Sequence, residues 1–238
     1  MALHGQDGAD PFEADGKQHV LNLLDWAIAL EGPRVRNNLA RARHRNPKAT
    51  PEQVIRSLER MYISTLAGTG LVTGAAAAAP RVGTGLAMML SGGQLLARFE
   101  RSAVFTLSLA EVHGVPIKEV ERRQTIVMGI LLGEGGAATI ARVAGRTGKH
   151  WARQVVGNTS VETLQKINRI LGDDFVTKYG NTNGIFALND LVPAVFGAVI
   201  GGGISFATAT GAVVASRHAF GAPPTSWPRQ RAPHSRCP

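Results

Sequence analysis

The fold of this chain is decided by residues 50–80, TPEQVIRSLERMYISTLAGTGLVTGAAAAAP, which begin with a helix-start signal. Thr50 can cap a helix, Pro51 suits the first helical position because no amide donor is needed there, and Gln53 completes a capping box. Apolar side chains then follow at spacings of four, three and one residue. This periodicity predicts an amphipathic helix, with its apolar face formed by Val54, Leu58, Met61 and Tyr62.

From residue 61 to residue 80 the same stretch contains no charged side chain, and two other parts of the chain share this property. They are residues 82–97 and residues 191–216. All three are rich in glycine and alanine, so little side chain would separate neighbouring helices. We therefore expect helices that approach one another closely.

Further helices are predicted over residues 86–113, 117–133 and 160–171. Gly114 is a standard helix end, Ser160 is the expected cap of the last of these helices, and Gly172 is its expected terminator. No segment alternates apolar and polar residues strictly enough to predict a strand. The sequence therefore predicts an all-α fold.

The composition of the two ends divides the chain of 238 residues into three parts. Residues 1–16 are polar and acidic and are predicted to be disordered. Residues 17–220 are predicted to form a single multi-helix domain, and residues 221–238, rich in proline and arginine, a tail. Acidic residues precede the first lysine, which is the reverse of a signal peptide, so we expect a cytoplasmic protein.

The chain is basic, with a formal net charge of +9. Residues 33–49 contain basic but no acidic side chains and are predicted to form a short basic helix followed by a loop. A basic balance favours a polyanion partner, either nucleic acid or anionic lipid, without choosing between them. Cys237 is the only cysteine, which excludes a disulfide within the chain and a cysteine-based zinc site.

Glycines four residues apart mark the expected helix contacts, because removing side chains at these positions makes a groove for another helix backbone. Residues 191–216 are long enough to span a bilayer, but the glycines at 201–203 divide them into halves that are each too short. We therefore predict a glycine-rich C-terminal helical hairpin, buried in protein or in one leaflet. The predicted packing glycines are Gly70, Gly74, Gly129, Gly133, Gly197, Gly201, Gly202 and Gly203.

A row of basic residues is the candidate contact for an anionic surface. On a continuous helix, spacings of four, three and four residues would align them in one stripe, beside a tryptophan. Such a stripe suits anionic lipid or a phosphate-rich partner, and a simple solvated face is the alternative interpretation. The residues are Arg142, Arg146, Lys149 and Arg153, with Trp151 beside them.

No motif predicts catalysis, a cofactor or a metal. Residues 68–74, GTGLVTG, are one residue too long for a dinucleotide fingerprint and follow a helix instead of a strand. Lys149 follows a glycine but lacks the Ser or Thr of a P-loop. No two histidines stand at metal-binding spacing. His113 lies near a helix end and is expected to satisfy backbone carbonyls there. An enzyme of unrecognised type is left as one alternative.

Three segments resemble the EcsC family of bacterial proteins. They are residues 69–80, TGLVTGAAAAAP, residues 107–115, LSLAEVHGV, with the following Glu121-Arg122-Arg123, and residues 191–203, LVPAVFGAVIGGG. The resemblance implies a helical, cytoplasm-facing protein without an established catalytic activity, and it brings no catalytic residues. It also suggests work near membranes or export machinery. The chain departs from the family at Ile204-Ser205, where relatives often carry an asparagine.

These observations lead to one main functional hypothesis and two rivals. The main hypothesis is a non-enzymatic protein that docks on the inner face of the cytoplasmic membrane or on a membrane protein complex. One rival is a soluble interaction module whose apolar helices are all internal. The other is a nucleic-acid-binding protein, which we disfavour because residues 34–48 lack interleaved aromatic side chains and match no known motif. The oligomeric state is left open.

Overall fold

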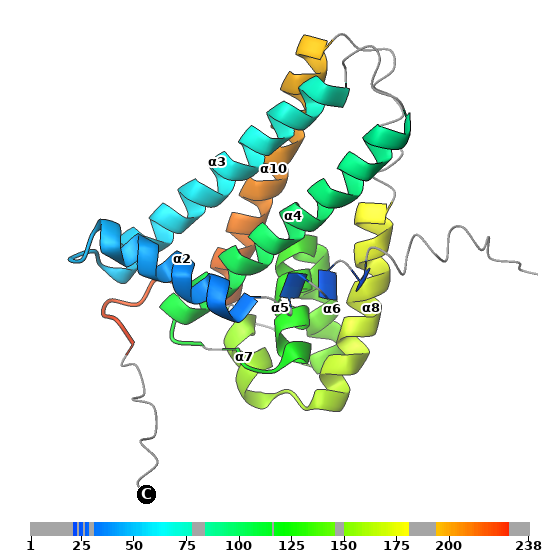
Figure 1. The fold of residues 1–238 in the computed structure, drawn as a ribbon. Helices are drawn as coiled ribbons and strands as arrows, with labels where there is room; N and C mark the ends of the chain where they lie inside the picture. Colours follow the sequence, from blue (N-terminus) through cyan, green and yellow to red (C-terminus); the bar gives the residue numbers. More distant parts are fainter. Residues whose placement is uncertain are drawn as a thin grey trace, which may run out of the picture.

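The computed structural model describes residues 21–22, 24–25, 27–28, 31–77, 84–115, 117–145, 150–180 and 194–228, and Figure 1 shows its fold. Within these residues every regular element is a helix, so the all-α prediction is confirmed for this part of the chain. The predicted disordered segment 1–16 lies outside it. The helices are α2 (Glu31–Arg45), α3 (Pro51–Ala77), α4 (Thr84–Val112), α5 (Val120–Leu132), α6 (Glu134–Ala144), α7 (Trp151–Asn158), α8 (Val161–Gly180) and α10 (Ala194–Phe220).

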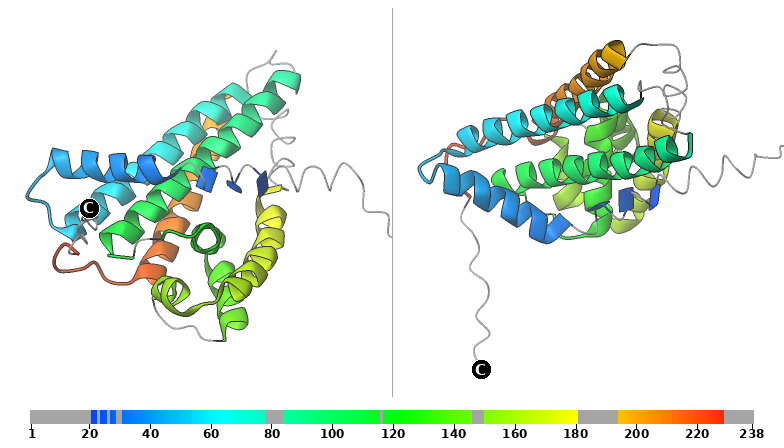
Figure 2. Two further views of the ribbon diagram at one scale, coloured as in Figure 1. Left: turned by 60° about the horizontal axis from the view of Figure 1, so that its bottom comes forward. Right: turned by 45° about the horizontal axis from the view of Figure 1, so that its top comes forward.

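Three long helices, α3, α4 and α10, run side by side and form one half of the molecule. Helices α3 and α10 pack antiparallel, and α4 lies beside both (Figures 1 and 2). Helix α2 crosses α4 and also touches α3. Helices α5 to α8 gather on the opposite side, where α5 and α7 contact α10 and α5 also contacts α4. The basic helix predicted within residues 33–49 is therefore observed as α2.

Helices α4, α5 and α8 contribute many of the large, fully buried side chains of the core. Its fully buried side chains include Leu109, Ile126, Ile130, Leu164 and Phe175. Each side chain of this size contributes about 1.5–3 kcal/mol when it leaves water completely. The spacing of three or four residues between the buried positions of one helix is what places them on a single face.

Local signals fix the ends of several helices as the sequence predicts. The Gln53 amide nitrogen donates to the Thr50 Oγ1 at 3.3 Å, and the Thr50 amide nitrogen donates to the Gln53 Oε1 at 3.1 Å, which completes the capping box of α3. Ser160 accepts a hydrogen bond from the Thr163 amide at 3.3 Å at the start of α8. Gly114 follows α4 with φ +70°, a conformation that glycine adopts readily.

Two predicted breaks are wrong, and in both cases packing outweighs the local preference. Gly172 does not end a helix, since α8 continues to Gly180, burying Phe175 and Val176. The glycines at 201–203 do not divide a hairpin, because α10 is one unbroken helix. Each interior glycine costs about 1 kcal/mol relative to alanine. The contact of α10 along α3 compensates for that cost, with Ser205, Ala209, Ala212, Val213 and Ser216 on the buried face of α10.

The first part of the predicted tail packs on the helices. The Trp227 indole nitrogen donates a hydrogen bond of 3.1 Å to the Ala49 carbonyl oxygen, in the loop between α2 and α3. The guanidinium of Arg43 lies over the same indole, 3.8 Å from the ring centroid. Residues 221–228 therefore join the packed structure, whereas residues 229–238 lie outside the described part.

Candidate functional site

The uncharged stretches of the sequence come together at one end of the molecule. Helix α3 finishes there, and α4 and α10 both begin there (Figure 1, top; Figure 2, right). We call this the charge-free end: residues 61–77 of α3, 84–97 of α4 and 194–206 of α10. Arg60 is the last charged residue of α3 and Arg98 is the first of α4. At 1.5 Å per residue, the charge-free part of α3 is about 25 Å long.

Large apolar side chains are exposed on this end. Val72 is 71% exposed, Phe206 is 52% exposed and Leu71 is 47% exposed. Single exposed apolar residues are common on proteins, but here three of them occur on helix segments that contain no charged residue. The sequence analysis did not single out these residues, because a helix pattern does not tell which side of an uncharged helix will lack a neighbour.

The hydroxyl groups near this end are satisfied within their own helices. Thr65 donates to the Met61 carbonyl oxygen at 2.6 Å, Thr69 donates to the Thr65 carbonyl oxygen at 3.0 Å, and Thr210 donates to the Phe206 carbonyl oxygen at 2.9 Å. A hydroxyl that is already bonded loses less when water is removed from it. The free-energy cost of removing these hydroxyl groups from water is therefore small.

The predicted packing glycines have different roles in the structure. A Cβ on Gly129 would lie 2.7 Å from Ile140 Cδ1 and 2.8 Å from Trp151 Cη2, so Gly129 is a true close contact. Its glycine partner is Gly136, which the sequence analysis missed, and not Gly133. Gly133 is the turn between α5 and α6, with φ +69° and nothing within 4 Å of a Cβ.

The other predicted glycines lie at or near the charge-free end. Gly70 is buried in α3, as its packing role requires, whereas Gly203 is exposed and has no atom within 4 Å of a Cβ. Gly203 is therefore no packing glycine. The surroundings of Gly74, Gly197, Gly201 and Gly202 lie outside the described residues.

The continuous helix that the basic stripe requires is absent. Helix α6 ends at Ala144, Gly145 adopts the left-handed conformation with φ +71°, and α7 begins only at Trp151. Arg146 and Lys149 lie outside the described residues. Trp151 is buried against Gly129 and is not an interfacial side chain. Arg142 and Arg153 are exposed but belong to different helices, because Gly145 stops the first of them.

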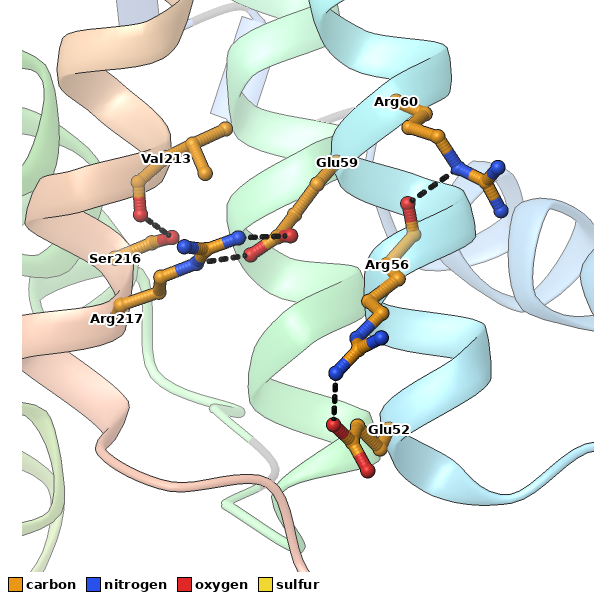
Figure 3. A network of polar contacts seen from close by, with 7 residues as sticks. All are labelled: Glu52, Arg56, Glu59, Arg60, Val213, Ser216 and Arg217. Atoms are coloured by element: carbon orange, nitrogen blue, oxygen red, sulfur yellow. Dashed lines mark hydrogen bonds and ion pairs between the residues drawn. The ribbon is translucent and has the colours of Figure 1, made fainter.

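A second candidate is a cavity of about 530 Å³ lined by residues of α3, α4 and α10 and by His150. Its charges are paired. The Arg217 guanidinium donates two hydrogen bonds to the buried Glu59 carboxylate, at 2.8 and 2.7 Å, and Arg56 contacts Glu52 at 2.5 Å (Figure 3). Ser216 donates to the Val213 carbonyl oxygen at 2.8 Å, so its hydroxyl is not bonded to a base. The Arg217–Glu59 pair joins α3 to α10, the other two contacts each lie within one helix, and none of them assembles a nucleophile.

His113 lines the same cavity and is buried at the end of α4. Its ring stacks on Phe220 with centroids 5.4 Å apart, and its Nδ1 has no hydrogen-bond partner among the described residues. That nitrogen therefore does not satisfy a helix carbonyl, contrary to the sequence-based expectation. Burial lowers the pKa of His113 to about 4, helped by the nearby charges of Arg153 and His150. The ring is neutral at pH 7.

Within the described ranges, no three His, Cys, Asp or Glu side chains are grouped so that they could hold a metal ion. In the same residues no helix combines the length and apolar character needed to cross a membrane. Among the described residues, the charge-free end is the surface on which we base the proposal below. No family model matches the sequence, and no curated protein or solved structure is significantly similar to it.

Proposed function

We propose that this chain is a non-enzymatic, EcsC-like helical protein that docks through its charge-free end on the anionic inner face of the cytoplasmic membrane. The observation that carries the proposal is the convergence of α3, α4 and α10 into one end, where the described helix segments have exposed apolar side chains and no charged residue. Two of the segments that resemble the family belong to this end, since they include the last part of α3 and the first part of α10.

The energetics support reversible docking. Full burial of a Val, Leu or Phe side chain is worth about 1.5–3 kcal/mol. When this value is scaled by the exposed fractions of Leu71, Val72 and Phe206, their transfer into an apolar environment contributes about 3–5 kcal/mol. This is enough for peripheral association but far less than the insertion energy of a membrane-spanning helix.

Co-sedimentation with vesicles tests the proposal. The intact chain is expected to pellet with vesicles that contain phosphatidylglycerol, and Val72→Asp is expected to reduce binding strongly. This substitution removes apolar contact and also places a charge where charge is absent. Val161→Asp is the matched control. Val161 is also an exposed valine, 45% exposed at the first residue of α8, where an acidic side chain is well tolerated. In Figure 1 the start of α8 lies at the bottom, away from the charge-free end.

The outcomes separate docking on lipid from the rival hypothesis. If the unmodified chain fails to pellet with both anionic and neutral vesicles, membrane docking is refuted and a protein-interaction module becomes the better explanation. If Val72→Asp and Val161→Asp bind equally well, the membrane contact lies elsewhere on the molecule.

A further inference from the structure

A groove of about 310 Å³ lies between α2, α3 and α4, where the charge-free end begins. Met61 and Thr65 line it from α3, and they belong to the first turns of the charge-free stretch. Three arginines also line it: Arg34 and Arg41 of α2 and Arg101 of α4. We call it the arginine groove.

The arginine groove carries more positive than negative charge. Glu100 is its only acidic lining residue, and it is paired with Arg34 at 2.9 Å. Arg41 and Arg101 contact no carboxylate within the described residues. The positions of Arg34 and Arg41, seven residues apart, place both on one side of α2. The three arginines and one glutamate give the groove a net charge of about +2, contributed by α2 and α4, and α3 contributes apolar side chains.

The floor of the groove is formed by two buried aromatic side chains, Tyr62 and Phe105. The rings of Tyr62 and Phe105 stack at 4.2 Å between centroids, with their planes 4° apart. The Tyr62 hydroxyl is bonded to the Ser102 hydroxyl at 2.9 Å, and burial raises the pKa of Tyr62 to about 12. A dry, uncharged floor lowers the local dielectric, so an anion held by the guanidinium groups is bound more strongly than it would be in bulk water.

We propose that the arginine groove binds the phosphate group of an anionic phospholipid. This inference rests on the proposed function. The planar guanidinium fork suits a phosphate, which accepts two parallel hydrogen bonds. A head group in the groove would direct its acyl chains along α3 beyond Thr65. From Thr65 to Ala77 that helix extends about 18 Å, close to the depth of one leaflet.

The test compares two double variants of equal charge. Arg41→Gln with Arg101→Gln removes both groove arginines that have no carboxylate partner. Arg36→Gln with Arg45→Gln removes two exposed arginines of α2 that do not line the groove. Binding to phosphatidylglycerol vesicles is expected to fall about thirtyfold for the groove variant, from about fivefold per arginine, and at most severalfold for the control. Arg41→Lys with Arg101→Lys keeps the charge but removes the planar guanidinium groups. Its loss of vesicle binding is expected to be smaller than that of the groove variant and larger than that of the control.

Two further measurements locate any failure. A thermal melt verifies that each variant is folded, which is expected because none of the substituted side chains is buried. Calorimetry with glycerol phosphate, without vesicles, tests for a soluble ligand. The groove inference alone is overturned if vesicles bind both double variants equally, or if glycerol phosphate binds the groove as tightly as the vesicles do. If the unmodified chain binds no vesicles, the proposed function is refuted, and the lipid-binding role of the groove is refuted with it.

Discussion

The substitution Gly136→Ala tests the close packing of α5 against α6. A Cβ at Gly136 would lie 2.6 Å from the Gly129 carbonyl oxygen, 2.8 Å from the Gly129 Cα and 2.9 Å from the Leu132 Cβ. Ordinary contacts of this kind are about 3.4–4 Å, and two of the three atoms belong to the backbone. They cannot rotate away as the end of a flexible side chain can, so one helix must shift.

The magnitude follows from two opposing terms. Over-packing a well-filled core by one methyl group costs about 1–3 kcal/mol. Replacing glycine by alanine inside a helix returns about 0.5–1 kcal/mol. The expected net loss of unfolding free energy is therefore about 1–2 kcal/mol. In a protein of this size, such a loss lowers the melting temperature by about 3–6 °C.

The adjacent residue supplies the control. Gly135 lies in the same helix and has no atom within 4 Å of a Cβ, so Gly135→Ala is expected to be neutral or to stabilise the fold by up to about 1 kcal/mol. Denaturation in guanidinium chloride, followed by circular dichroism at the helix band, measures both variants. The packing argument is wrong if Gly136→Ala proves as stable as Gly135→Ala.

Two other predictions concern the cavity between α3, α4 and α10. Arg217→Ala leaves the Glu59 carboxylate, which is 6% exposed, without its partner. We therefore expect a denaturant titration to show a loss of about 2–3 kcal/mol in the free energy of unfolding, and a smaller loss for Glu59→Gln. Equal stability of Arg217→Ala and the unmodified chain would contradict this. His113 has a pKa of about 4 in the fold and about 6.5 when unfolded, so between these values the unfolded chain binds more protons and stability falls as the pH falls. The loss of unfolding free energy is at most about 3 kcal/mol at pH 4. In His113→Gln, the unfolding free energy from urea titrations should depend less on pH between these values. An unchanged pH dependence in that variant would show that other groups titrate.

Elements with short-range signals could be predicted from the sequence. The start of α3 at Pro51, the cap at Ser160 and the stop at Gly114 depend on contacts within a few residues, which the amino-acid pattern reports directly. The uncharged stretches were also visible. Their convergence at one end was not, because it depends on the pairing of α3 with α10, which are distant in the chain.

The errors have the same physical origin. Gly172 and the glycines at 201–203 are weak helix formers, yet tertiary packing holds their helices intact. Conversely, Gly145 does end a helix, and this removes the stripe expected through Arg142 and Arg153. The arginine groove was missed because Arg41 and Arg101 are sixty residues apart in sequence, and only the packing of α2 on α4 brings them to one site.

The pairing of α3 with α10 also has a consequence for biosynthesis. Helix α3 is complete once Ala77 has been added, but α10 is complete only at Phe220. At ordinary translation speeds of about 5–20 residues per second, the interval is on the order of ten seconds. During that time the uncharged residues 61–77 of α3 are without their main partner helix. We therefore expect this stretch of the nascent chain to be exposed to other apolar surfaces until α10 has been made.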